Sequence, residues 1–441
     1  MSDLEKAFKA LTAKQGYLRT RWNYYDGNQP LKYSQERLSE VFGGVFATFR
    51  QNWCSVVVDC TLDRIVLKGF DVPSSGEAAK KLNEIVDLTN LDLDAEEIHR
   101  DALITGKSFV IAWKRENGSL DVYHNRNEMC HIFYDPEFPK QKKFAAKWFF
   151  GTDEKWHMTL YYPEKLEYFV SSGKEMPTSF SGFKASKKAA TNPFGEIPVF
   201  EFNCQSDLND VLEPQDAVNK LAADMMVASE FGSFKQRWVI SNSNTATLKN
   251  SPNEVWDIPA GDGTGQQTSV GEFAGEDLTK FLNAVDKWAN YVAIKTRTPK
   301  HYLKDVGAGI SGDALIAMEA PLIKKCGKRV KQFGETWKDL ASFLLRLEGI
   351  SLRSDKILPV WDRIKSEQPL AELQAINFGV SSGLALKTML RREGWTSEEI
   401  AQAENDKREE DLAKTNLAKV LLEEARKKQA EANLTGFEGA Q

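Results

Sequence analysis

Apolar residues recur every three or four positions through the first 25 residues of the chain. This spacing puts them on one face of an amphipathic helix over residues 3–25. The residues on that face are Leu4, Phe8, Leu11, Leu18, Trp22 and Tyr25. The helix is expected to end at the turn-forming cluster DGNQP, residues 26–30.

More helix and one strand are predicted before the chain changes character. A second helical stretch is expected from about Ser34, and its apolar face includes Trp53, Val57 and Cys60. The sequence RIVLKGF, residues 64–70, is typical of a strand. Residues 76–106 have the helical spacing again and end at a glycine.

Residues 108–202 form a region of alternating apolar and polar positions, with little helical spacing. Two β-rich runs flank Glu116-Asn117-Gly118, which predicts a hairpin. Further strand candidates are FAAKWFF, WHMTLYYP, KLEYFV and IPVFEF. The pattern therefore predicts an antiparallel β region.

Two long helices are predicted on either side of a polar, turn-rich module. The first covers residues 209–238 and would be about 40 Å long, and the second covers residues 275–297. Residues 239–274 between them consist of short strand candidates and Gly, Ser, Thr and Asn turns. We expect the two helices to be antiparallel and to hold a compact β-rich tip away from the body.

The last third of the chain is predicted to be mainly helical. Residues 298–312 indicate an exposed, flexible loop, and Ser311 is placed to cap the helix that follows. That helix covers residues 313–348 and is expected to be interrupted at Pro321. Shorter helices and a charged, helix-prone segment follow over 349–441, with the final residues LTGFEGAQ expected to be disordered.

Composition and charge place the chain among ordinary soluble proteins. It has 441 residues, 41% of them hydrophobic, which is enough for two or three sub-domains. Its net charge of −5 argues against a broad grip on DNA but not against a protein that DNA passes. No apolar run approaches the ~18 residues of a membrane span, and the N-terminus lacks the apolar stretch of a secretory signal.

The cysteines and histidines predict neither a disulfide framework nor a metal site. The five cysteines are scattered without a C-x-x-C pair, which favours reduced, buried thiols. Cys130 and His131, with His124 upstream, match no zinc-ligand spacing. We therefore expect no metal and no cofactor.

One glycine pattern raises the possibility of a nucleotide site. Gly307, Gly309 and Gly312 have the G-x-G-x-x-G spacing of a dinucleotide-binding loop. Such a loop follows a buried strand, whereas here TPKHYLKDV precedes it. The glycine-rich run 261–269 lacks the lysine of a phosphate-binding loop, and no catalytic constellation is found. A nucleotide-dependent enzyme remains the alternative that rests on these glycines alone.

Five stretches in order resemble the portal proteins of tailed bacteriophages, of the siphovirus type, over roughly residues 15–410. They are YYDGNQPLKY, NWCSVVVDCTLDRIVLKGF, NPFGEIPVFEF, DAVNKLAADMMVASEFGSFKQRW and TRTPKHYL followed by ISGDALIAMEAPLIKKC. The resemblance implies an α+β, predominantly helical portal fold. Its implied parts are a wing (1–208), a stem of two helices (209–238 and 275–297), a β-rich clip (239–274), a tunnel loop (298–312), a long wing or core helix (313–348), and a helical crown and tail (349–441).

The same resemblance implies a ring, a dodecamer in this family, at one capsid vertex of the virion. Double-stranded DNA would be packaged and ejected through the ring. Its implied partners are the terminase large subunit, a head–tail adaptor, and the major capsid and scaffolding proteins, with assembly in the host cytoplasm and no membrane. The chain would have no enzymatic activity of its own, and another head-morphogenesis or adaptor protein remains an alternative.

The resemblance also selects candidate site residues. In the tunnel loop, Lys300 and Lys304 are candidates for contacts with the DNA backbone, while Gly307 and Gly309 would make the loop mobile. The candidates for the clip surface that faces the terminase or adaptor are Asn250, Asn253, Trp256 and Asp262.

Overall fold

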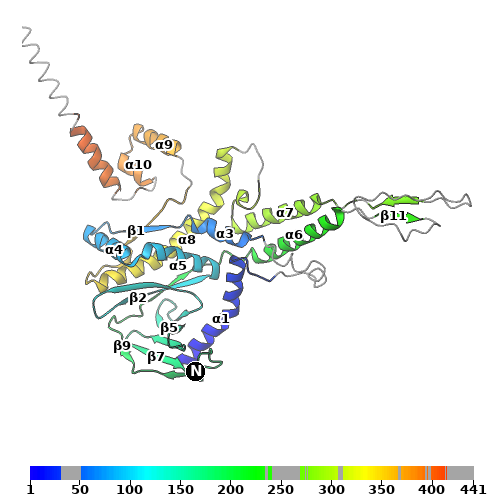
Figure 1. Cartoon of the computed structure of the whole chain (residues 1–441). Helices are drawn as coiled ribbons and strands as arrows, with labels where there is room; N and C mark the ends of the chain where they lie inside the picture. The colour runs from blue at the N-terminus through cyan, green and yellow to red at the C-terminus, as the bar shows by residue number, and fades with distance from the viewer. Residues whose placement is uncertain are drawn as a thin grey trace, which may run out of the picture.

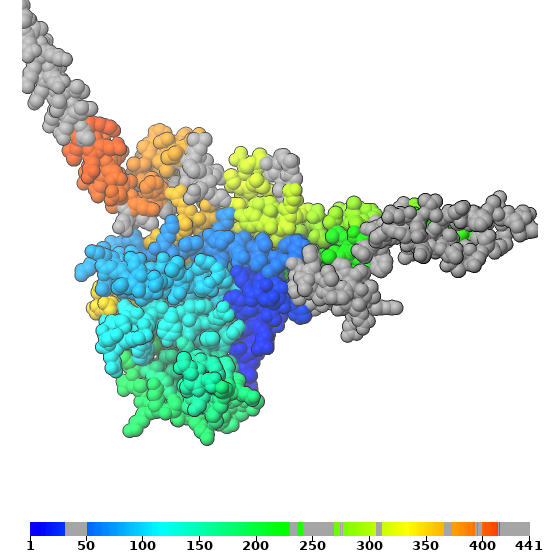
Figure 2. Space-filling view, viewed as in Figure 1, coloured from blue at the N-terminus to red at the C-terminus, as the bar shows by residue number. Residues whose placement is uncertain are grey.

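The protein consists of a helix–sheet body from which a two-helix arm projects (Figures 1 and 2). The computed structural model describes residues 1–30, 51–233, 237–240, 269–273, 275, 277–305, 311–365, 369–392, 395, 399–412 and 414. Residues 34–50 of the helical stretch predicted from Ser34 and the tail LTGFEGAQ lie outside these residues, whereas Trp53, Val57 and Cys60 of that stretch are described.

The helices of the body lie in stretches that the sequence predicts as helical, but the stretch 76–106 forms two helices that meet at Asn90. The body helices are α1 (Asp3–Tyr25), α3 (Trp53–Leu62), α4 (Gly76–Thr89) and α5 (Leu91–Thr105). Asn52 starts α3 because its side-chain oxygen accepts hydrogen bonds from the Cys54 and Ser55 backbone N–H groups at 3.1 and 3.3 Å. Gly106 ends α5 with a φ of 94°, a left-handed conformation that glycine adopts without a side-chain clash.

Two antiparallel sheets make up the predicted β region. The first has the order β10-β2-β3, with β2 (Lys107–Lys114), β3 (Leu120–Asn125) and β10 (Val199–Asn203). The second has the order β4-β5-β6-β7-β8, and β9 also pairs with β7. Its strands are β4 (Cys130–Tyr134), β5 (Lys142–Phe150), β6 (Trp156–Tyr161), β7 (Lys165–Ser171), β8 (Phe183–Ala185) and β9 (Ala190–Thr191). Gly118, with a φ of 87°, forms the predicted hairpin turn between β2 and β3.

A third pairing joins distant parts of the chain. β1 (Leu67–Asp71) is antiparallel to β13 (Leu358–Trp361), with Leu67 opposite Trp361. Residues 358–361 lie in the part of the chain predicted to be mainly helical, so this strand was not predicted. The pairing ties the C-terminal part of the chain to the first helices of the body.

The long helix α8 (Gly312–Leu347) crosses the body and supplies much of its core. Ser311 caps it as predicted, because its hydroxyl oxygen accepts a 3.3 Å hydrogen bond from the Ala314 backbone N–H. The predicted interruption at Pro321 is wrong, since one helix continues through it. A proline inside a helix costs about 3 kcal/mol. Burial of large apolar side chains beyond Pro321, each contributing about 1.5–3 kcal/mol, offsets that cost. The largest of these are Leu322, Phe333, Trp337, Leu340, Phe343 and Leu344.

The arm consists of α6 (Leu212–Ser233) and α7 (Thr279–Thr296), with the strand pair β11 (Arg237–Ile240) and β12 (Ser269–Glu272) beyond them (Figure 1). The prediction that the first helix reaches residue 238 is wrong, because Arg237 and Trp238 belong to β11. Trp238 pairs with Gly271, and a Cβ atom at Gly271 would lie 2.5 Å from the Trp238 ring. Close cross-strand packing that only glycine permits therefore overrides the helical spacing there.

The C-terminal part continues with α9 (Pro369–Ser381), α10 (Leu386–Arg392) and a helix over 399–412, which lie above the body in Figure 1. The five cysteines are buried and free, as predicted. No helix in the described ranges is both long and apolar enough to cross a membrane.

Candidate functional site

The structure describes some of the predicted site residues and not others. Lys300 and Lys304 lie in the segment that joins α7 to α8, and Gly312 is the first residue of α8. Gly307 and Gly309 lie in 306–310, outside the described residues. The four clip candidates, Asn250, Asn253, Trp256 and Asp262, also lie outside them.

The first half of the segment between α7 and α8 is held against the body. Thr298 and Leu303 are only 3% and 6% exposed, and the short helix η3 (Lys300–Tyr302) lies between them. The Thr296 and Thr298 hydroxyl groups are hydrogen-bonded at 2.9 Å. The prediction of an exposed loop is therefore wrong for Thr298, Pro299 and Leu303, which are buried, whereas Lys300 and Tyr302 are exposed as predicted.

A cluster of polar side chains ties η3 to α8. The Tyr302 hydroxyl donates a 3.1 Å hydrogen bond to Glu319 Oε1, and Arg64 pairs with Glu319 Oε2 at 3.1 Å. Arg64 also donates to the Ile364 carbonyl oxygen at 2.8 Å. Glu319 is 8% exposed, so its charge is compensated inside the protein. Near the N-terminal end of α8, this cluster therefore connects Glu319 with Tyr302 of η3 and with the distant residues Arg64 and Ile364.

The two candidate lysines differ in their surroundings. Lys300 is exposed, whereas the Lys304 ammonium forms a 2.8 Å ion pair with Asp286 Oδ2 of α7. Asp286 is about half exposed, so this pair is weak and a phosphate could replace the carboxylate. Both residues remain predicted DNA contacts.

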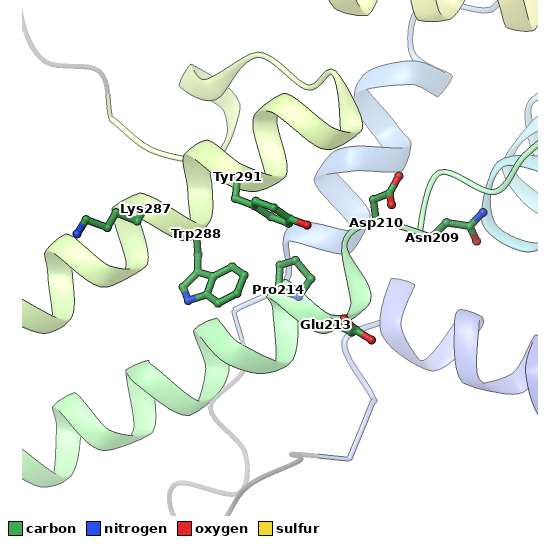
Figure 3. Close-up of a pocket in the computed structure, with 7 residues that line it drawn as sticks. All are labelled: Asn209, Asp210, Glu213, Pro214, Lys287, Trp288 and Tyr291. Atoms are coloured by element: carbon green, nitrogen blue, oxygen red, sulfur yellow. The ribbon is translucent and has the colours of Figure 1, made fainter.

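A groove lies between α6 and α7 where the arm leaves the body (Figure 3). Trp288 and Tyr291 of α7 point toward Pro214 of α6, while Lys287 points away. The Trp288 and Tyr291 rings meet edge to face at 5.7 Å. Tyr291 is 45% exposed, which leaves an aromatic surface on the arm.

A basic pocket lies beside this groove, and the sequence did not predict it. It has a volume of about 280 Å³, and Lys325 and Arg329 of α8 pair with the buried Asp207 in it, at 2.8 and 2.6 Å. Its lining residues are Gln205, Ser206, Asp207, Asp210, Lys295, Thr296, Arg297, Lys325, Lys328 and Arg329. The sequence signal that could have revealed it is KKCGKRVK, residues 324–331, where five of eight residues are cationic.

His99 is buried in the body among aromatic side chains. His99 is stacked on Phe333 with ring centroids 5.0 Å apart, and its Nε2 accepts a 3.0 Å hydrogen bond from Trp337 Nε1. Burial lowers the pKa of His99 to about 3, so the ring is neutral near pH 7. Across the described part of the chain, no group of three or more His, Cys, Asp or Glu side chains is placed to hold a metal ion.

A helix–sheet body that carries a two-helix arm and one long capped helix has the predominantly helical α+β fold of a phage portal subunit. The sequence model of the family "Phage portal protein, SPP1 Gp6-like" matches residues 9–412, and the chain belongs to that family. The predicted portal family and fold class are therefore confirmed.

Individual relatives are distant. The chain is 24% identical over 320 residues to the portal protein of Mycobacterium phage L5, covering 66% of this chain and 63% of the relative. It is 24% identical over 373 residues to the portal protein of Mycobacterium phage D29, covering 74% and 73%. The match thus spans just under two thirds of the L5 protein. A chain from the neck of an empty gene transfer agent (GTA) particle has a TM-score of 0.47 and 10% identity, covering 83% of this chain and 96% of that one.

Proposed function

We propose that the protein forms the ring-shaped channel at one capsid vertex through which double-stranded viral DNA is packaged and ejected. The observation that carries this proposal is the match of the portal family to residues 9–412, which is nearly the whole chain. The ring would be a dodecamer built through a heterologous interface that closes on itself.

Under this proposal, each part of the structure corresponds to a part of a portal subunit. The body up to residue 208 is the wing, and α6 and α7, within 209–238 and 275–297, form the stem. The module 239–274, which includes part of β11 and all of β12, is the clip, and 298–312 is the tunnel loop. α8, over 313–348, is the core helix, and the remainder, 349–441, forms the crown and tail.

The same proposal assigns the partners. The clip, with candidates Asn250, Asn253, Trp256 and Asp262, would face the terminase large subunit and later the head–tail adaptor. The body would contact the major capsid and scaffolding proteins. The protein would be assembled in the host cytoplasm, reside in the virion, and have no catalytic activity or cofactor of its own.

DNA would meet the tunnel loop. Lys300 and Lys304 would touch the phosphate backbone, and Gly307 and Gly309 would let the loop move with the passing duplex. Burial of Thr298 and Leu303 holds the start of this segment against the body. This supports the proposal that the mobile part of the loop lies beyond residue 303. If particles carrying Lys300→Ala and Lys304→Ala package DNA at the wild-type rate, these side chains are dispensable.

The structure favours this function over a nucleotide-dependent enzyme. A dinucleotide-binding loop follows a buried strand. Here the residues before the glycines are not a strand: Arg297 has a left-handed backbone conformation, and η3 follows at Lys300–Tyr302. Gly312 is the first residue of α8, directly after the capping residue Ser311. Native mass spectrometry and negative-stain microscopy test the proposal. We expect a ring of about a dozen subunits with an axial hole, whereas a monomer or dimer that binds nucleotide would contradict it.

A further inference from the structure

The basic pocket at the junction of α7 and α8 combines charges from three segments of the chain. Lys295 and Arg297 come from the end of α7, while Lys325, Lys328 and Arg329 come from α8. The third segment, just before α6, supplies the carboxylates Asp207 and Asp210. Five cationic side chains therefore face two carboxylates in a chain whose net charge is −5. A local excess of positive charge in a pocket attracts anions.

Part of this charge is already compensated inside the protein. The Asp207 side chain is 1% exposed and pairs with both Lys325 and Arg329. Three exposed cations lie at the mouth of the pocket: Lys295, Arg297 and Lys328. Asp210 is the other carboxylate that lines the pocket, so these cations outnumber it. The excess charge is consequently at the mouth, where a ligand can reach it.

One buried donor of the pocket lacks an acceptor. Arg329 NH1 donates to Gln332 at 3.1 Å, and NH2 donates to Asp207 at 2.6 Å and to the Gln205 carbonyl oxygen at 2.5 Å. The Nε–H group of this 92% buried side chain has no hydrogen-bond acceptor among the residues that the structure describes. An unpaired buried donor is unfavourable, and an acceptor oxygen of a ligand would satisfy it.

The positive charge also extends along α8 beyond the pocket. Lys324, Lys328 and Lys331 are all exposed and are spaced four and three residues apart, so they share one face of the helix. This row is about 10 Å long. Double-stranded DNA carries one negative charge per ~1.7 Å of its axis, so a row of this length faces several phosphates at once. A small anion would use the pocket but not the row.

We propose that the basic pocket and the lysine row of α8 together form a binding site for the phosphate backbone of double-stranded DNA, separate from the tunnel-loop lysines. This inference rests on the proposed function, in which DNA passes the protein. The site would bind without reading sequence, since it offers only cations to phosphates. It places a second contact region at the junction of the arm and the body.

The test compares two triple variants of the full-length protein with equal charge changes. Lys324→Ala/Lys328→Ala/Lys331→Ala removes the row, and Lys184→Ala/Lys187→Ala/Lys188→Ala removes three exposed lysines in and beside β8 of the body. Binding of a fluorescein-labelled 30-bp duplex is measured by anisotropy from 50 to 200 mM salt. The row variant is expected to bind about 100-fold more weakly at 0.1 M salt, with its salt slope reduced by about 2.7. The control variant is expected to change the slope by less than one.

A single substitution tests the pocket itself. Arg297 has a φ of 59°, so Arg297→Gly removes the guanidinium group while suiting the left-handed backbone. We expect its salt slope to fall by about 0.9, one phosphate contact. Equal slopes for wild type, row variant and Arg297→Gly would overturn the proposal.

Two further measurements distinguish DNA from other possible ligands of the basic pocket. Calorimetry with inorganic phosphate that shows tight binding, together with unchanged DNA binding in the row variant, would mean a small-anion site and overturn the proposal. Native mass spectrometry of the same variants reports the ring. If the row variant loses the ring while its DNA affinity is unchanged, the pocket binds a carboxylate of a neighbouring subunit instead. If wild type forms no ring, the proposed function fails, whatever the salt slopes show.

Discussion

The long helix α8 of the body and the helix α7 of the arm bury their apolar residues to very different extents. α8 in the body contains Phe333, Trp337 and Leu340, none of which is exposed to solvent. α7 in the arm exposes Leu282, Tyr291 and Ile294 by 55%, 45% and 79%. α8 thus contributes to a buried core, whereas these three apolar side chains of α7 stay exposed in the described part of the chain. We therefore expect changes in the core around α8 to affect stability more than changes on the surface of α7.

Removal of the largest buried side chain should affect the body most. Trp337→Ala is expected to lower the free energy of unfolding by about 3–5 kcal/mol, because a fully buried indole is replaced by a cavity. The matched arm variant, Trp288→Ala, removes a half-buried indole and should cost about 1 kcal/mol. Urea denaturation of both measures the difference, and equal losses would contradict the contrast between body and arm.

Ion pairs should show the same contrast. Asp207→Asn leaves Lys325 and Arg329 without their buried carboxylate and should cost about 3 kcal/mol. In the pair of Asp286 on α7 with Lys304, the carboxylate is about half exposed, so Asp286→Asn should cost less than about 1 kcal/mol. Thermal unfolding at low and high salt compares them. A large salt-sensitive loss for the arm variant would show that its pair is not a simple surface contact.

The body should also lose stability in acid through His99. Its folded pKa of about 3 lies below the unfolded value of about 6.5, so between these values the unfolded chain binds a proton that the folded one does not. Stability is therefore expected to fall as the pH drops below 6.5, by about 2 kcal/mol at pH 5. His99→Phe should remove this dependence. Denaturation of both proteins at pH 7 and pH 5 measures it, and parallel pH profiles would refute this role.

The smallest expected effect on stability is on the arm surface. Ile294→Ser should change the free energy of unfolding by less than about 0.5 kcal/mol, because Ile294 is 79% exposed. It should nevertheless lower the fraction of ring in native mass spectrometry. Leu88→Ser on α4 of the body, at a residue 81% exposed, is the matched control and should leave the ring intact. A ring fraction that falls equally in both variants would mean that α7 has no special part in assembly.

Local signals in the sequence predicted most elements of the fold. The spacing of Leu4, Phe8 and Leu11 gave α1, the Asn117-Gly118 turn gave the β2–β3 hairpin, and Ser311 gave the start of α8. These predictions succeed because the causes, amphipathic spacing, turn chemistry and capping, lie within a few residues of each other.

The errors have causes outside the local sequence. Trp238 is in a strand because Gly271 accommodates its ring, and α8 continues through Pro321 because the residues beyond it are buried. The candidate site was predicted even less completely. The tunnel-loop lysines were named, but the basic pocket was missed, because Lys295, Asp207 and Arg329 come together only when α7 and α8 pack at the base of the arm.

The sequence by itself determined the family, the α+β class, and the order of body, arm and long helix, because amphipathic spacing, turns and caps are written into short stretches of chain. Tertiary structure alone decided three further features. It paired β1 with β13, buried Thr298 and Leu303 against the body, and gathered the cations of α7 and α8 around Asp207. Each of these depends on contacts between residues far apart in the chain, where burial and charge pairing outweigh local preference.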